Sequence, residues 1–219
     1  IASPFEGQAT DNAKALAKAL LAGERKAILL GNAAAHHPGA STLLALCQWI
    51  GEQTGATVGF LTEAANTVGA QVVNALPGSG GLNAGQMLAG GLRAALLLNC
   101  EPGADSAPAD LSACEMVVTL SPFKANMDIS DVLLPIAPFT ETSGSFVNAE
   151  GRVQSFHAVV RPLGDTRPGW KVLRVLGDLL GLQQPAYETS PEVLAQALGA
   201  GVTDRVPESR LSNRTSARA

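Results

Sequence analysis

Five short runs of apolar residues constrain the fold of this sequence more than any other feature. The runs are continuous rather than alternating, and segments with helical spacing or turn residues separate them. Strands that are apolar on both faces are typical of a parallel sheet covered by helices on both sides. Their alternation with helices predicts an α/β fold with a doubly wound, mostly parallel sheet and flanking helices. The runs are KAILLG (26–31), ATVGF (56–60), RAALLLN (93–99), EMVVTLS (115–121) and DVLLPIAP (131–138).

The pattern changes after Pro138, where the last apolar run ends. Residues 143–160 alternate loosely around NAEG (148–151), which predicts a β-hairpin, and residues 167–182 have the spacing of an amphipathic helix. A final short helix is expected at 191–198, and the arginine-containing tail has no periodicity. We therefore expect an α/β domain at 1–183, a short C-terminal helix and linker at 184–202, and a disordered tail at 203–219. The first residue is Ile1 rather than Met, so we expect a piece of a longer chain.

The charge distribution limits the classes of partner. The net charge of −4 argues against binding to nucleic acid. From Ala27 to Leu92 there is no Lys or Arg, and only Glu52 and Glu63 are acidic, although ordinary protein surfaces carry more charge. This stretch either lies mostly in the interior or faces another protein. Under the second interpretation, the helix from Pro38 to Gly51 and the glycine-rich loop at 63–81 would form the contact.

The three cysteines and the apolar runs exclude several other classes. Cys47, Cys100 and Cys114 are widely spaced and form no CxxC, so we expect no metal site and no iron–sulfur ligand set within this chain. Reduced, mostly buried thiols of a cytosolic protein are the simpler interpretation. No apolar run reaches the length of a membrane span, and we expect no signal peptide at the start.

The hairpin sequence ETSGSFVNAEGRVQ is open to two interpretations. Its ionisable residues could be acid–base groups or contacts to a cofactor. They could instead be structural, with the Arg152 guanidinium paired to a carboxylate, the glycines adopting positive φ in turns and Asn148 bonding to its own backbone. The structural interpretation is favoured because the hairpin contains no nucleophile. The residues concerned are Glu141, Gly144, Asn148, Glu150, Gly151 and Arg152.

Two adjacent histidines follow the first apolar run. His36 and His37 precede Pro38, near the start of a predicted helix, and therefore near the carboxyl end of the first strand. Ligands bind at that edge in doubly wound sheets, so both are candidate cofactor-binding residues. The loop GNAAAHHPG contains three alanines and little that could hold a phosphate, which favours a structural role.

A series of motifs between about Lys26 and Leu182 resembles the molybdopterin oxidoreductase family. Upstream, ILLGNAAAHHPGA resembles that family's strand–glycine–loop–histidine segment, and NTVGAQVVNALPG resembles its Asn-Gly-Pro loop, which makes Asn66 a third candidate for cofactor binding. The rest of the series lies in and after the fifth run: Asp131, Leu134, Pro135, Glu141, Gly144, Phe146, Asn148, Glu150, Gly151, Arg152, Val153, Gln154 and Trp170. The order of the motifs makes the resemblance specific.

Within the family, the chain most resembles the C-terminal part of the large iron–sulfur subunits of bacterial NADH:quinone oxidoreductases. The resemblance implies a molybdoenzyme fold without molybdenum, and 4Fe–4S and 2Fe–2S clusters held elsewhere in the full subunit. The resemblance implies that this chain is a structural, partner-binding part of the subunit, that it is not catalytic alone, and that it holds no cofactor or metal. Its partners would be the N-terminal part of the same subunit and neighbouring subunits, in the cytoplasmic peripheral arm of a membrane-attached complex. The alternative is a piece of an active molybdopterin enzyme of the formate dehydrogenase or nitrate reductase type.

Overall fold

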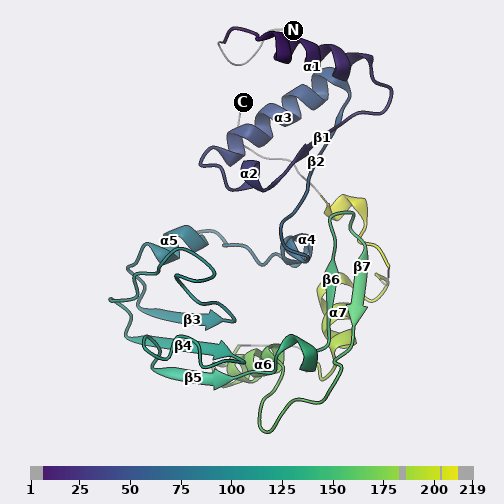
Figure 1. Cartoon of the computed structure of the whole chain (residues 1–219). Coiled ribbons are helices and arrows are strands. Elements are labelled where there is room, and N and C mark those ends of the chain that lie inside the picture. Colours follow the sequence, from purple (N-terminus) through teal and green to yellow (C-terminus); the bar gives the residue numbers. More distant parts are fainter. Residues whose placement is uncertain (1–6, 183–185, 203, 212–219) are drawn as a thin grey trace. The chain divides into compact units, whose positions relative to one another are not determined.

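The chain folds into two compact units. The computed structural model describes residues 7–182, 186–202 and 204–211 (Figure 1). Unit 1 comprises Ile1–Val72, Val147–Val153 and Asp204–Ala219, and unit 2 comprises Val73–Phe146 and Gln154–Thr203. The β-hairpin therefore contributes its turn to unit 1 and the remainder of its two strands to unit 2.

Unit 1 is built around a two-stranded parallel sheet. β1 pairs with β2 from Ala27 opposite Thr57 to Leu30 opposite Phe60, and α3 contacts both strands. Because the strands are parallel, their carboxyl ends meet at one edge, and the loops after both strands leave the sheet there. The elements are α1 (Asp11–Ala22), β1 (Ala27–Leu30), α2 (Asn32–Ala35), α3 (Ala40–Thr54), β2 (Thr57–Phe60) and α4 (Thr67–Val72).

A buried glycine lets α3 pack closely against the end of the sheet. A Cβ atom at Gly51 would lie 2.7 Å from Val58 Cγ2 and 2.9 Å from the carbonyl oxygen of Ala56. The second of these atoms belongs to the backbone and cannot rotate away. The absence of a side chain at Gly51 therefore sets the distance between α3 and β2.

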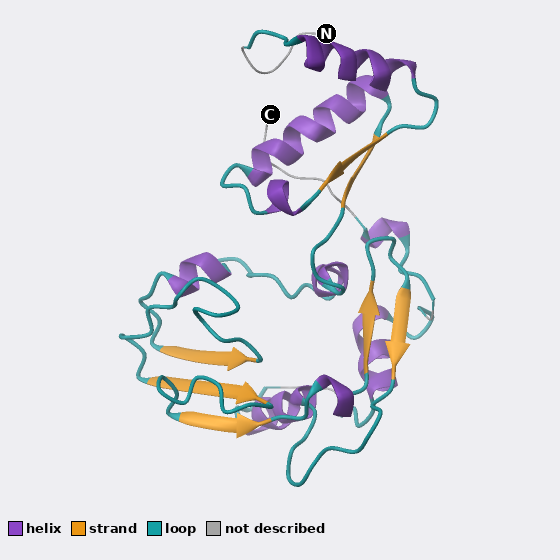
Figure 2. Ribbon diagram, viewed as in Figure 1, coloured by secondary structure: helices purple, strands orange, loops and turns teal. Residues whose placement is uncertain are grey.

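Unit 2 contains a three-stranded parallel sheet with β4 in the centre (Figure 2). β4 pairs with β3 on one side and β5 on the other, so both of its edges are hydrogen-bonded. Leu120 and Thr119 of β4 are fully buried, and the Asp131 carboxylate accepts a hydrogen bond from the Val117 N–H at 2.7 Å. The elements are α5 (Ala84–Leu88), β3 (Ala94–Leu98), β4 (Met116–Ser121), β5 (Val132–Pro135), the 3-10 helix η1 (Phe139–Glu141), α6 (Gly169–Leu179) and α7 (Ser190–Leu198).

The hairpin is formed by β6 (Gly144–Val147) and β7 (Val153–Phe156), which run in opposite directions (Figure 2). Phe146 and Phe156 pack edge to face with ring centroids 5.1 Å apart, a favourable geometry for aromatic pairs. The Ser145 and Ser155 hydroxyls hydrogen-bond across the strands at 2.8 Å. These cross-strand contacts fix the register of the predicted hairpin.

The predicted fold class is confirmed: the chain is α/β, with parallel sheets, flanking helices and a hairpin. The five predicted parallel strands all form, and they divide between two sheets. Two local details differ from expectation. Residues 63–81 were expected to form a loop but contain α4. A doubly wound sheet has a helix between successive strands, but the segment between β3 and β4 contains none.

Local hydrogen bonds explain why the segment before β4 is not helical. The Asp110 carboxylate accepts hydrogen bonds from the Ser112 hydroxyl at 2.6 Å and from the Ser112 N–H at 3.1 Å. Such side-chain bonds compete with helix formation. The bond from the Ser112 hydroxyl is also the main reason that the pKa of Asp110 is lower than its ordinary value, with a further contribution from the Ser112 N–H.

Part of the expected disordered tail has a defined place in unit 1. The Val153 N–H donates to the Asp204 carbonyl at 2.7 Å, the Val206 N–H donates to the Gly151 carbonyl at 2.8 Å, and the Val206 side chain is almost fully buried. The 3-10 helix η2 (Glu208–Arg210) follows. Residues 204–211 thus differ from the expectation because the hairpin turn supplies them with hydrogen-bond partners and an apolar contact. Residue 203 and residues 212–219 lie outside the described part of the chain.

Candidate functional site

His36 lies at the carboxyl edge of the unit 1 sheet, as predicted. It caps the carboxyl end of α2, and its Nε2 is 2.7 Å from Oε2 of Glu63, which follows β2. Both side chains are exposed. The parallel arrangement of β1 and β2 therefore brings together two polar residues that are far apart in sequence, at the edge where doubly wound sheets bind ligands.

His37 has a local structural contact. Its Nδ1 accepts a hydrogen bond from the Gly39 N–H at 2.9 Å, immediately before α3 begins. A neutral imidazole with Nδ1 as the acceptor carries its proton on Nε2. The contact orders the turn that contains Pro38, and it leaves only Nε2 of His37 available for other interactions.

The side chain of Asn66 is hydrogen-bonded to the hairpin. Its Oδ1 accepts a hydrogen bond from the Val147 N–H at 2.8 Å, and Val147 is buried. The Asn66 side chain also occupies the space where a Cβ at Gly69 would lie, so a larger residue at that position would displace Asn66 from its hydrogen bond to Val147. The structure thus supports a structural contribution from Asn66.

The turn of the hairpin is ordered by Asn148. Its Oδ1 accepts hydrogen bonds from the Glu150 N–H at 3.0 Å and from the Arg152 N–H at 2.9 Å, as expected for an asparagine that bonds to its own turn. The Gly151 N–H donates to the Asn148 carbonyl at 2.9 Å. Gly151 has the predicted positive φ, 78°, whereas Gly144 does not, because it lies in the extended strand β6.

The expected ion pair of Arg152 does not form among the described residues, so this prediction is wrong for that part of the chain. The Arg152 side chain is exposed, between the buried Gly151 and Val153, and none of the ion pairs among the described residues includes it. Arg205 holds the turn instead, because its guanidinium donates to the Glu150 carbonyl at 2.8 and 3.2 Å. A strand places alternate side chains on opposite faces, and position 152 is on the exposed one.

We expect Asn148→Ala to lower the free energy of unfolding by about 1 kcal/mol, because two turn N–H groups lose their acceptor. The loss should be seen in thermal melting and in faster amide exchange at Glu150 and Arg152. Asn148→Asp retains an acceptor oxygen and should lose less. Arg152→Ala is the surface control and should change stability by at most about 0.5 kcal/mol. Equal melting temperatures for Asn148→Ala and Arg152→Ala would contradict this account of the turn.

Glu141 and Gly144 lie on the unit 2 side of the hairpin. The Glu141 Oε2 accepts a hydrogen bond from the Leu163 N–H at 3.0 Å and so anchors the long loop after the hairpin. A Cβ at Gly144 would lie 2.8 Å from the Phe156 ring. Both contacts support the structural interpretation of these residues.

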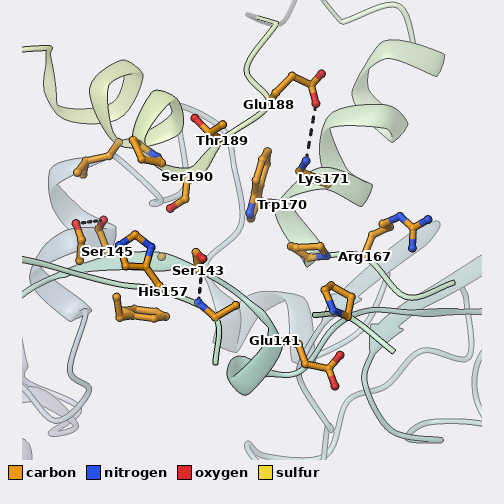
Figure 3. Close-up of a pocket in the computed structure, with 18 of the residues that line it drawn as sticks. Glu141, Ser143, Ser145, His157, Arg167, Trp170, Lys171, Glu188, Thr189 and Ser190 are labelled. Atoms are coloured by element: carbon orange, nitrogen blue, oxygen red, sulfur yellow. Dashed lines mark hydrogen bonds and ion pairs between the residues drawn. The ribbon is translucent and has the colours of Figure 1, made fainter. Parts of the chain in front are cut away.

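A cavity of about 620 Å³ in unit 2 lies between the hairpin, the loop at 157–168 and the first turns of α6 and α7 (Figure 3). In Figure 3, Trp170 stands near its centre, between Lys171 on one side and Ser190 and His157 on the other. The volume is in the usual range of ligand pockets. The lining residues are Glu141, Ser143, Gly144, Ser145, Ser155, Phe156, His157, Ala158, Arg161, Pro162, Arg167, Pro168, Trp170, Lys171, Glu188, Thr189, Ser190, Pro191 and Leu194.

Most of this cavity was not predicted from the sequence. Glu141 and Gly144 were singled out for the hairpin, but the polar wall that includes Ser143, His157 and Arg161 was not. The available signal was the group of cationic residues that follows the hairpin, Arg161, Arg167 and Lys171.

Side chains that could ligate a metal lie apart from one another among the described residues. Among them, no three His, Cys, Asp or Glu side chains come together as a metal site requires. Burial raises the pKa of Cys47. Burial is also the main reason that the pKa of Cys100 is raised, and the nearby carboxylates of Asp105 and Glu101 raise it further. No helix in the described ranges has the length and hydropathy needed to cross a membrane.

Comparison with known proteins gives a family match and several partial relatives. The family model of molybdopterin oxidoreductases matches residues 10–179. The NADH-ubiquinone oxidoreductase 78 kDa subunit of Candida albicans is 45% identical over 56 residues, which are 26% of this chain and 8% of the relative. The corresponding subunit of Neurospora crassa is 44% identical over 57 residues, 26% of this chain and 8% of the relative.

A third relative has a different name. A putative formate dehydrogenase of Staphylococcus aureus is 40% identical over 52 residues, which are 24% of this chain and 5% of the relative. Each aligned segment thus spans less than a tenth of the length of the curated relative that it matches.

Proposed function

Because the chain belongs to the molybdopterin oxidoreductase family, we propose that it is a structural, partner-binding part of a subunit of an NADH:quinone oxidoreductase. In this proposal it holds no redox centre. Electrons from NADH pass towards quinone through iron–sulfur clusters that lie elsewhere in the full subunit. The chain positions that subunit against its neighbours.

The donor chemistry of the described residues is the observation that carries the proposal. A redox centre needs ligands that converge, and the three free cysteines belong to no cluster of three possible metal ligands among the described residues. The two candidate histidines and Asn66 already have hydrogen-bond partners within the protein. The names of the two fungal relatives support the assignment to a subunit of an NADH-oxidising complex.

The proposal extends to the surroundings of the chain. Its partners are the remainder of the same subunit and neighbouring subunits, and its place is the peripheral arm of a membrane-attached complex, on the cytoplasmic side in bacteria. The 4Fe–4S and 2Fe–2S clusters belong to the full-length subunit. The family resemblance supports these statements, and the names of the two fungal relatives support the place in an NADH-ubiquinone oxidoreductase.

An active molybdopterin enzyme is the second candidate. The observation in its favour is the match to the putative formate dehydrogenase, together with the polar pair His36 and Glu63 at the carboxyl edge of the unit 1 sheet. The exposure of both side chains weakens this alternative, because cofactor sites usually enclose most of the bound group.

We expect the purified chain to contain no stoichiometric iron, molybdenum or pterin. Elemental analysis measures the metals, and fluorescence after oxidation measures the pterin. Reconstitution with iron and sulfide should give the same absorption for the native chain and for a control in which Cys47, Cys100 and Cys114 are all replaced by serine. One molybdenum per chain, or cluster absorption that the serine control lacks, would refute the proposed function.

A further inference from the structure

Three large apolar side chains are exposed in the two segments beside the unit 2 cavity. Phe139 in η1 is 84% exposed, and Val159 and Leu163 in the following long loop are 81% and 78% exposed. Single exposed apolar residues are common, but several in one region usually mark a surface that binds another molecule. These residues lie at the two segments, η1 and the loop at 157–168, that frame the cavity.

The long loop is held in place by hydrogen bonds near each of its apolar residues. The Val159 N–H donates to the Thr140 carbonyl at 2.8 Å, and the Leu163 N–H donates to the Glu141 carboxylate at 3.0 Å. The Ala158 N–H donates to the Ser143 hydroxyl at 3.0 Å (Figure 3). A loop fixed in this way presents its side chains without a large cost in conformational entropy on binding.

The cavity offers an aromatic anchor point. Trp170, at the first turn of α6, is half-buried, and its ring faces the cavity (Figure 3). The Lys171 Nζ lies 5.2 Å from the centroid of the Trp170 ring, and the Tyr187 ring centroid is 6.0 Å away, so neighbouring groups hold the indole. Tryptophan in a pocket, with arginine nearby, is the composition typical of residues that contribute most to protein–protein binding.

The charged side chains that line the cavity carry a net positive charge. Three are cations, Arg161, Arg167 and Lys171, and two are carboxylates. Glu141 accepts a hydrogen bond from the loop backbone, and Glu188 lies 3.2 Å from Arg174 and 3.8 Å from Lys171. Arg161 is exposed and forms no ion pair with another described residue. The Arg167 guanidinium donates only to loop carbonyls among the described residues, at 2.7 and 3.4 Å.

We propose that this surface, formed by the cavity and the residues Phe139, Val159 and Leu163, is a docking site for an acidic segment of another protein chain. An apolar side chain of that segment enters the cavity against Trp170, and its carboxylates lie beside Arg161 and Arg167. Complementary charge of this kind selects partners and their orientation. The inference rests on the proposed partner-binding function and specifies the chemistry of one partner.

The test uses the 219-residue chain and a library of displayed random peptides. Selected peptides should be enriched in sequences with an aromatic or aliphatic residue flanked by Asp or Glu. A synthetic peptide of the enriched sequence is then titrated into the Trp49→Phe chain, in which Trp170 is the remaining tryptophan. Its fluorescence should change on saturation, and the affinity should fall as salt is raised.

Arg161→Glu should weaken binding of the synthetic peptide by roughly tenfold, because it replaces an attraction by a repulsion. Arg25→Glu makes the same change of charge at another exposed position and should leave the affinity unchanged. Leu163→Ser should also weaken binding, whereas Leu16→Ser, at another exposed leucine, should not. Circular dichroism of each variant verifies that it remains folded.

Several outcomes would overturn the docking site. Selected peptides that are neutral or basic, or no enrichment at all, would contradict the proposal. Equal affinities of the Arg161→Glu and Arg25→Glu chains for the synthetic peptide would also contradict it. So would a change of Trp170 fluorescence that inorganic phosphate or phenyl phosphate produces but peptides do not. The last would assign the cavity to a small anion. These results are independent of the metal analysis: a metal-free chain that selects no acidic peptides would refute only the docking site, and bound molybdenum would refute the proposed function whether or not peptides bind.

Discussion

Replacing Leu120 by alanine is expected to lower the free energy of unfolding of unit 2 by about 3 kcal/mol, within the range typical of buried leucines. Leu120 lies on β4, the central strand of the three-stranded sheet, and is 0% exposed. Its removal loses apolar contacts and leaves a cavity that hydrogen-bonded strands on both sides cannot fill. Urea unfolding followed by circular dichroism measures the loss.

Leu96→Ala is the matched control. Leu96 lies on the adjacent strand β3, where it is paired with Val118 of β4, and it is 46% exposed. The same change of side chain should therefore cost much less, about 1 kcal/mol, since the hydrophobic contribution scales with the area buried. Similar losses for the two variants would mean that β4 is not the centre of the core.

Gly151→Ala is expected to lower the free energy of unfolding of unit 1 by about 2 kcal/mol, from backbone strain and a smaller packing cost. Gly151 has φ of 78°, a conformation that costs residues with a Cβ about 1 kcal/mol or more. The Cβ would also lie 2.5 Å from Leu211 Cδ1 and would disturb the contact between the hairpin turn and residues 204–211. Thermal melting measures the loss of stability. Faster amide exchange at Val206 would show that the loss arises at the contact between the hairpin turn and residues 204–211.

Gly164→Ala separates the two contributions. Gly164 has φ of 58°, also in the left-handed region, but no atom lies within 4 Å of the position of its Cβ. Its replacement should cost only the backbone strain, about 1 kcal/mol. If the two alanine variants melt alike, the contact of Gly151 with Leu211 contributes nothing to stability.

Most secondary structure was predictable because its causes are local. The apolar runs became β1 to β5, the NAEG turn became the turn between β6 and β7, and the amphipathic segment became α6. Helix α4 was missed because its sequence, TVGAQV, consists largely of weak helix formers. Its position depends on Asn66 and the buried Gly69, a tertiary arrangement that local propensity does not contain.

The candidate site was predictable only in part. The positions of His36 and His37 after the first strand followed from the order of elements, but the pairing of His36 with Glu63 required the two strands to be parallel neighbours. The cavity around Trp170 could not be found from the sequence, because the hairpin, the loop and two helices each contribute residues to its wall.

The sequence by itself determined the α/β class, the order of the elements, the hairpin and the family, because these depend on residue periodicity and on motifs in fixed order. Only the tertiary structure decided that Arg205 rather than Arg152 holds the turn, and that residues 204–211 pack beside it. Arg205 binds a carbonyl 55 residues away. A contact over that distance is selected by the arrangement of the surrounding elements, and no local pattern in the chain specifies it.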